Sequence, residues 1–204
     1  MFLQALSVLR PSSQANYFVE KFPDAQGARG KRLLVVTLRE YHSQPERNSR
    51  LKDWAMFLTE LDKRNYFPIV VRDTYTSFEL APDCLKSFCQ FPQGAVDYQL
   101  RVALYQRAWL NMGVSTGPMY AISFLPNVAS IVFQMISEDN PSNTRLSIRK
   151  IGLVEGEDYA FRDNNFQKLF WGEDSYENIC RAFFSMLEEM GEVGDCYANV
   201  SKKK

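Results

Sequence analysis

Residues 32–40 read RLLVVTLRE, a continuous apolar run with branched side chains that ends in charged residues. Such a run is typical of a strand buried on both faces, as in parallel sheets. The segment 50–65 carries apolar side chains at spacings of three and four, which predicts an amphipathic helix: Leu51, Trp54, Leu58 and Leu61. Residues 66–73, YFPIVVRD, read as a second buried strand. This order of strand, helix and strand predicts an α/β fold.

The rest of the chain continues the alternation. We expect a short third strand within 84–91, a helix over 96–110, a strand over 111–115, a helix opened by Pro118, a strand over 128–136 and a terminal helix over 175–190. The segment 137–165 is polar, and its pattern favours no element. Together these elements predict a Rossmann-like open sheet, mostly parallel, with helices on both faces.

Turn and linker residues mark the two ends of the chain. Residues 1–30 contain Pro11, Pro23 and Gly30, and we expect a lead-in segment that is poorly structured or helical. One Rossmann-like domain is expected over 31–192. Residues 193–204 end in three lysines and are expected to form a flexible basic tail.

The composition excludes several classes of protein. The 204 residues include 24 basic and 24 acidic side chains, and this balance argues against binding to nucleic acid or an anionic membrane. Cys84 and Cys89 do not have zinc-knuckle spacing and His42 is the only histidine, so we expect no metal site. Without a leader or a long apolar run, we expect no membrane span and a cytoplasmic protein with free thiols.

Polar side chains follow the predicted strands, where parallel sheets bind ligands. The candidate binding residues after the first strand are Arg39, Arg47, Asn48 and Ser49, and those after the strand at 111–115 are Ser115, Thr116 and Gly117. Tyr41 follows the first strand as well, and Arg72 and Asp73 follow the second. If the strands are ordered as expected, these groups converge at one edge of the sheet.

The junction Ser115-Thr116-Gly117-Pro118 has two interpretations. Glycine lets a ligand approach the backbone, and the N–H groups at a helix start favour an anion, so the junction can cradle a diphosphate with Arg39 or Arg47 beside it. Equally, it is an ordinary strand-to-helix turn.

The other candidates also have plain structural interpretations. Arg39 and Arg47 can pair with Glu40 or Glu46 on the surface. Asn48 or Ser49 can supply the N-cap of the helix over 50–65.

The segment GVSTGPMYAISFLPNVASIVF, residues 113–133, is similar to the glycine-proline segment of GT-B-fold glycosyltransferases, in particular of the heptosyltransferase-like group. The strand, arginine-bearing loop, tryptophan-bearing helix and strand over 32–73 resemble the start of the same nucleotide-sugar-binding half, the C-terminal one. Residues 164–187 look like its closing stretch. The resemblance covers about residues 32–190.

This resemblance implies a function and a set of contacts. Ser115, Thr116 and Gly117 would face the diphosphate of a nucleotide sugar, and Arg39, Arg47 and Asn48 would line the loop beside it. The family pattern has an aspartate in the loop occupied here by Val114, Ser115 and Thr116, and a histidine where this chain has Tyr120. The family also needs a second Rossmann-like half, which brings the catalytic base, so no catalytic residue is assigned.

Three functions remain open. The chain is the donor domain of a glycosyltransferase, with a nucleotide sugar as substrate, no cofactor or metal, and an acceptor-binding domain or partner chain. Alternatively, it is a non-catalytic nucleotide-, sugar- or protein-binding module of the same fold. The third function is a small phosphate-ester hydrolase, for which Asp73 is the best carboxylate.

Overall fold

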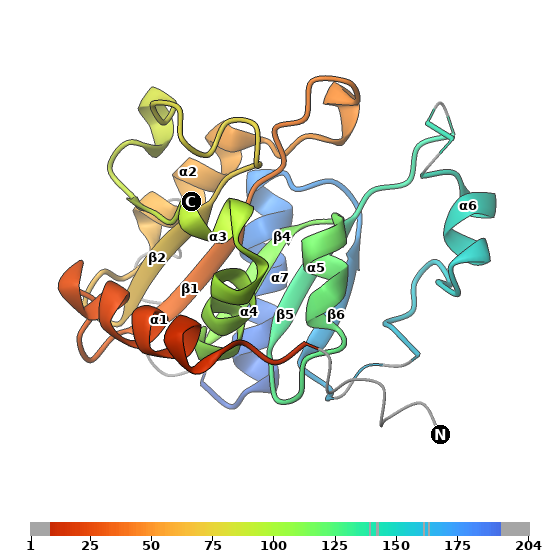
Figure 1. Cartoon of the computed structure of the whole chain (residues 1–204). Coiled ribbons are helices and arrows are strands. Elements are labelled where there is room, and N and C mark those ends of the chain that lie inside the picture. Colours follow the sequence, from red (N-terminus) through yellow and green to blue (C-terminus); the bar gives the residue numbers. More distant parts are fainter. Residues whose placement is uncertain (1–8, 139, 142, 161, 163, 193–204) are drawn as a thin grey trace, which may run out of the picture.

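Six parallel strands form one sheet in the order β3-β2-β1-β4-β5-β6 (Figure 1). The computed structural model describes residues 9–138, 140–141, 143–160, 162 and 164–192. The strands are β1 (Arg32–Thr37), β2 (Tyr66–Val71), β3 (Cys89–Gln90), β4 (Leu110–Val114), β5 (Ser130–Gln134) and β6 (Gln167–Trp171). The order changes direction between β1 and β4, as in doubly wound α/β folds. The Rossmann-like fold predicted from the sequence is therefore confirmed.

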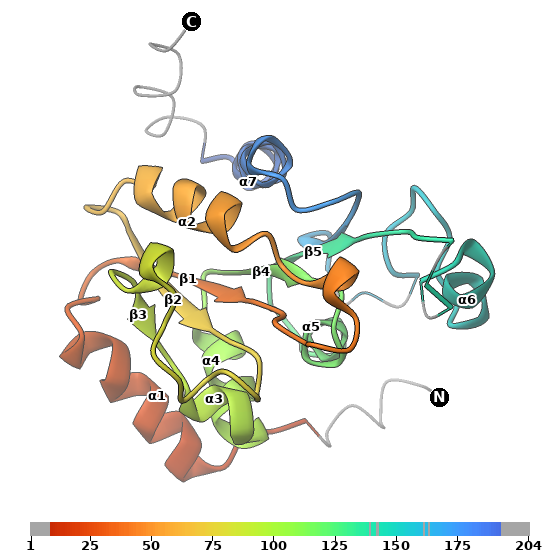
Figure 2. The same cartoon turned by 90° about the horizontal axis from the view of Figure 1, so that it is seen from above.

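Helices cover both faces of the sheet (Figure 2). One face carries α2 (Leu51–Glu60) and α7 (Tyr176–Glu189), and the other carries α1 (Ser13–Ala25), α3 (Gln93–Val96), α4 (Tyr98–Arg107) and α5 (Gly117–Ile122). The short helix α6 (Arg145–Lys150) lies to the side, beyond β5 and β6. Two single turns of 3-10 helix, η2 (Pro45–Arg47) and η3 (Asp83–Leu85), complete the fold.

Alternation along β1 explains the two layers. Leu34 and Val36 pack with Trp54 against α2 and α7, whereas Leu33 and Val35 pack against the opposite helices. Successive side chains of a strand point to opposite faces, so a strand covered on both sides is apolar throughout. The uninterrupted apolar run in β1 is the direct consequence.

The two polar segments of the sequence have different outcomes. The predicted lead-in contains α1, which agrees with its helical alternative, and Ala15 and Val19 of α1 are buried in the core of that face. The polar region before the last helix is followed by β6, an edge strand that the apolar pattern did not indicate. The predicted tail, residues 193–204, lies outside the described residues.

The predicted N-cap of α2 is wrong. Arg50 occupies the cap position, and no side chain accepts a hydrogen bond from the first turn. Ser49 Oγ instead accepts from the backbone N–H of Arg39 at 2.9 Å, and Asn48 Oδ1 accepts from that of Tyr41 at 2.8 Å. Both side chains close the β1–α2 loop rather than start the helix.

Gly113 in β4 is required by packing. A Cβ at this position would lie 2.5 Å from the backbone oxygen of Thr37 in the neighbouring strand and 3.3 Å from Met119 Sδ. We expect Gly113→Ala to lower the free energy of unfolding by about 2 kcal/mol, measured by urea denaturation, because backbone must move to admit the methyl group. Gly117→Ala is the matched control, since a Cβ there meets nothing within 4 Å. Equal stability of the two variants would contradict this account.

The structure also bears on membrane-spanning helices and on the state of the cysteines. Within the described ranges, no helix is both long and apolar enough to span a membrane. Cys84, Cys89 and Cys180 are free, and burial raises the pKa of the Cys89 thiol to about 11. A thiol with a raised pKa is a poor nucleophile at neutral pH, so this cysteine is part of the packing.

Candidate functional site

Arg47 joins the two strands at which the sheet order changes direction. It lies at the end of η2, in the loop after β1, and its Nη2 donates to the backbone oxygen of Ser115 at 3.3 Å. Ser115 is the first residue after β4. Ligands of doubly wound folds bind outside the carboxyl ends of the strands at this crevice. The structure thus brings Arg47 and Ser115 together where the sequence predicted a site.

Arg39 and Arg47 meet on a neutral side chain. Nη2 of Arg39 and Nη1 of Arg47 both donate to Gln44 Oε1, at 3.0 and 3.1 Å. Among the residues that the structure describes, neither arginine forms an ion pair. The Nε atom of each is buried without a hydrogen-bond partner. Two guanidinium groups therefore keep donor capacity and positive charge at the edge of the sheet.

The electrostatics agree with this arrangement. Burial and the neighbouring charge of Arg39 lower the pKa of Arg47, as expected for two cations held close together. Glu46 is the neighbouring carboxylate, and it accepts a hydrogen bond from the side-chain amide of Asn140. Hydrogen bonds from its own backbone N–H and from Asn140 lower the pKa of Glu46. Pairing of Glu46 with Arg47 is not observed.

The predicted alternative pairing of Arg39 with Glu40 is wrong. Glu40 accepts two hydrogen bonds from Arg72, each at 2.8 Å, and Arg72 also donates to the backbone oxygen of Glu79. The Arg72 side chain is only 5% exposed. Arg72 therefore holds the loops after β1 and β2 together and does not lie at the site. Arg39 instead stacks its guanidinium over the Tyr41 ring at 5.2 Å.

Asn48 and Ser49 hold the arginine-bearing loop after β1 through hydrogen bonds to its backbone. Besides accepting from Tyr41, Asn48 donates through Nδ2 to the backbone oxygen of Tyr41 at 3.0 Å. Ser49 is buried and holds the backbone of Arg39. The next backbone N–H, that of Arg50, donates to Asp174 Oδ2 at 3.0 Å. These bonds fix the ends of the loop, so Arg39 and Arg47 are preorganised.

The Ser-Thr-Gly junction contributes less than a full cradle of N–H groups. Thr116 is the N-cap of α5, and its side chain accepts from the backbone N–H of Met119 at 3.4 Å. Pro118 has no N–H to offer. Gly117 is exposed, and a Cβ there would point into open space. The junction is both an ordinary capped helix start and a place where backbone is accessible.

Ser115 has the most distinctive environment of the junction. The residue is only 2% exposed, and its Oγ has no hydrogen-bond partner. Burial raises the pKa of Tyr120, and the nearby Ser115 hydroxyl and the Arg47 charge oppose that rise. The Tyr120 hydroxyl is within hydrogen-bond reach of Gln134 Oε1 at the end of β5. The Ser115 hydroxyl is therefore buried beside the Tyr120 hydroxyl, while the backbone oxygen of Ser115 accepts from Arg47.

Three of these neighbours were not predicted as site residues. Gln44 precedes Arg47 by three positions, a spacing that places the two side chains on one face of a helical turn. Tyr120 stands where the family pattern has histidine, and this departure was its only signal. Gln134 ends an apolar strand, and nothing in the sequence indicated that it would meet Tyr120.

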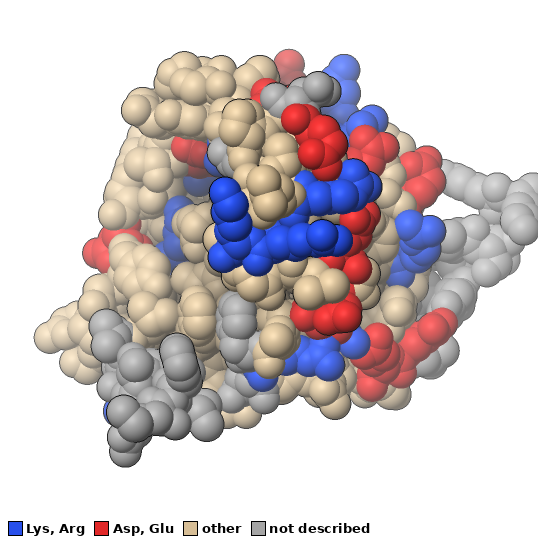
Figure 3. Space-filling view, turned by 90° about the vertical axis from the view of Figure 1, so that its right-hand side faces the viewer, with Lys and Arg blue, Asp and Glu red and all other residues tan. Residues whose placement is uncertain are grey.

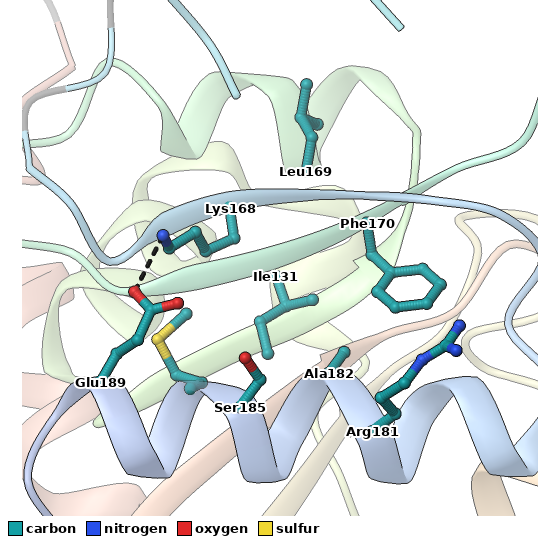
Figure 4. A pocket seen from close by; sticks show the side chains of 9 residues that line it. Ile131, Lys168, Leu169, Phe170, Arg181, Ala182, Ser185 and Glu189 are labelled. Atoms are coloured by element: carbon teal, nitrogen blue, oxygen red, sulfur yellow. Dashed lines mark ion pairs between the residues drawn. The ribbon is translucent and has the colours of Figure 1, made fainter. Parts of the chain in front are cut away.

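A hollow lies away from the carboxyl edge of the sheet (Figure 4). It has a volume of 280 Å³ and lies between β6 and α7, with Ile131, Phe170 and Ala182 in its wall. Its Lys168 pairs with Glu189 at 2.8 Å. The residues of β5 and β6 that line it include the second residue of each strand, so it opens on the flank of the sheet rather than at the carboxyl edge.

Figure 3 shows the face of the molecule that lies on the right-hand side of Figure 1, and the surface charge of this face is mixed. Basic side chains gather near the middle of the face and are bordered directly by acidic ones. Ion pairs of this kind occur elsewhere in the fold, as between Arg145 and both Glu138 and Glu155 in the segment around α6. The face therefore lacks the continuous basic surface that nucleic-acid binding requires. Among the described residues, no group of three or more candidate ligand side chains is placed to hold a metal ion.

Two solved structures share the fold. A glycosyl transferase family 9 protein from Veillonella parvula is similar with a TM-score of 0.58 and 12% identity, and ADP-heptose LPS heptosyltransferase II of E. coli with 0.55 and 9%. Each match covers 88% of this chain and 53% of the other, so the chain spans about half the length of these structures. No family model and no curated protein sequence matches the chain. The heptosyltransferase-like resemblance is thus confirmed as a likeness of fold.

Proposed function

We propose that the carboxyl edge between β1 and β4 binds the diphosphate of a nucleotide sugar, and that the chain acts as the donor-binding part of a glycosyltransferase. The observation that carries the proposal is the pair Arg39 and Arg47, two guanidinium groups held by Gln44 and not by a carboxylate. An anion would accept hydrogen bonds from these guanidinium groups and balance their charge. The solved glycosyltransferases of the same fold support this choice of ligand.

The arrangement suits one part of glycosyl transfer. When the bond between sugar and diphosphate breaks, negative charge develops on the diphosphate. Arg39 and Arg47 would stabilise that charge from fixed positions. Electrostatic stabilisation of this kind is usually the largest contribution that a protein makes to catalysis. The nucleotide sugar is the substrate, so the proposal needs no resident cofactor. The acceptor and the base that activates it are assigned to a further domain or a partner chain, and a cytoplasmic location stays a prediction.

A ligand screen tests the proposal directly. The purified chain is mixed with UDP, GDP, ADP or CMP and with their common sugar conjugates, and binding is followed by ligand-observed NMR. We expect saturable binding of one nucleoside diphosphate and of its sugar conjugate. Failure of every diphosphate to bind would contradict the proposed site.

Gly117 offers a specific test of the junction. We expect Gly117→Val to weaken diphosphate binding about tenfold, because the added side chain fills open space beside Ser115 where the ligand would approach. The stability of the fold should change little, since a Cβ at this position meets no neighbour within 4 Å. Isothermal titration with the diphosphate found in the screen measures the effect. Unchanged affinity would mean that the junction is only a helix start.

A further inference from the structure

A hollow at the carboxyl ends of β5 and β6 lies next to the proposed diphosphate site. It has a volume of about 430 Å³, which is large enough for a monosaccharide. It is lined by residues from the η2 loop, the ends of both strands and the segment before β6: Glu46, Gln134, Met135, Ile136, Ser137, Glu155, Trp171, Gly172 and Glu173.

The walls combine an aromatic ring with apolar side chains. Trp171 ends β6, and its Nε1 donates to the backbone oxygen of Glu157 at 2.8 Å. That bond holds the nitrogen edge of the indole ring against the segment before β6. Met135 and Ile136 leave β5 and line the same hollow. A fixed indole face beside aliphatic side chains is a surface on which the C–H face of a sugar ring packs.

The charged side chains in the lining of the hollow are all acidic, and two of them pair with arginines outside the lining. Glu46, Glu155 and Glu173 line it, and its lining contains no lysine or arginine. Each carboxylate is held in place from outside the lining: Glu155 by Arg145 at 2.8 Å, Glu173 by Arg50 at 2.8 Å, and Glu46 by Asn140. Carboxylates accept hydrogen bonds from hydroxyl and ammonium groups and repel other carboxylates. The lining therefore offers acceptors to hydroxyl and ammonium groups and contains no cation of its own for an acidic group.

The hollow and the arginine pair are continuous. Glu46 precedes Arg47 in η2, and Gln134 meets the hydroxyl of Tyr120. The backbone N–H of Ser115 donates to the oxygen of Phe133, the residue before Gln134. The carboxyl edge thus presents two guanidinium groups between β1 and β4 and three carboxylates at β5 and β6. A ligand with an anionic end and a neutral or cationic end would have one orientation on it.

We propose that this hollow binds the sugar unit of the ligand, and that it favours amino sugars over neutral sugars and both over uronic acids. The link to the diphosphate rests on the proposed function. The sugar preference rests only on Trp171 and the three glutamates, and it is tested with sugars that carry no phosphate.

The test uses the methyl glycosides of glucosamine, glucose and glucuronic acid, with the full chain and saturation-transfer NMR. We expect affinity to fall in that order, and we expect the glucuronide not to bind. Glu155→Gln should reduce the preference for the glucosaminide over the glucoside by about threefold or more, because one acceptor charge is lost. Glu189→Gln, on the flank hollow, is the matched control and should change nothing.

Variants of Trp171 distinguish the contribution of ring packing from that of the carboxylate charges. We expect Trp171→Ala to abolish binding of both sugars, while Trp171→Phe keeps a ring and retains the order of affinities. If Trp171→Ala does not fold, the order of affinities measured for Trp171→Phe still tests the proposal. Equal binding of glucuronide and glucosaminide would overturn the proposal, as would no sugar binding by a chain that still binds a nucleoside diphosphate. Loss of diphosphate binding alone would instead contradict the proposed function.

Discussion

Glu40→Ala is expected to lower the free energy of unfolding by about 3 kcal/mol, because it leaves the Arg72 guanidinium buried without its carboxylate. The side chains are 5% exposed for Arg72 and 12% for Glu40, and two hydrogen bonds of 2.8 Å join them. The hydrogen bonds to Glu40 raise the pKa of Arg72. A guanidinium group stays charged in proteins even without a carboxylate partner, so Glu40→Ala leaves a buried cation. A buried cation without its anion is among the costly outcomes of a single substitution.

Urea denaturation of the full chain measures this effect. Glu20→Ala is the matched control, since Glu20 is an exposed glutamate whose surface ion pair with Lys21 should contribute less than about 0.5 kcal/mol. Glu40→Gln should lie between the two, because the amide keeps one acceptor for Arg72. If Glu40→Ala and Glu20→Ala lower the free energy of unfolding by the same amount, the Glu40–Arg72 pair does not hold the loops after β1 and β2 together.

The elements with uniform burial were predictable from the sequence. The strands β1, β2, β4 and β5 are apolar because helices cover both of their faces. The helix α7 begins at a serine cap and shows regular apolar spacing, so its predicted range, 175–190, agrees closely with Tyr176–Glu189. The edge strand β6 was not predicted, because it is covered less completely and its sequence QKLFW mixes polar and apolar residues.

The position of the candidate site could be predicted from the sequence, but the hydrogen-bond and ion-pair partners of its residues could not. The rule that ligands bind at carboxyl ends of parallel strands placed Arg39, Arg47 and Ser115 at one edge, and the structure brings Arg47 to Ser115. Which arginine pairs with Glu40 depends on how the loops after β1 and β2 pack, and local spacing carries no information about that. The same holds for Asn48 and Ser49, whose hydrogen bonds within the β1–α2 loop replaced the expected helix cap.

Arg47→Ala is expected to weaken binding of a nucleoside diphosphate about 100-fold. Truncating a half-buried charged group that contacts an anion typically costs 2–5 kcal/mol, which corresponds to a factor of roughly 30 or more. Arg47 also joins the β1–α2 loop to β4 through Ser115. Loss of that neutral-acceptor bond should cost only about 1 kcal/mol of stability, so the variant folds. Arg47→Lys keeps the charge but loses the fork geometry, and we expect it to recover only part of the affinity.

Arg64→Ala is the control for charge alone. Arg64 is an exposed arginine near the amino end of β2, opposite the proposed site, and its removal changes the net charge by the same amount. The measurement that tests the central claim is isothermal titration of the wild-type chain, Arg47→Ala and Arg64→Ala with the nucleoside diphosphate found in the screen. Binding that is lost in Arg47→Ala and kept in Arg64→Ala is the predicted result. Equal affinity of the wild-type chain and Arg47→Ala would contradict a diphosphate site between β1 and β4.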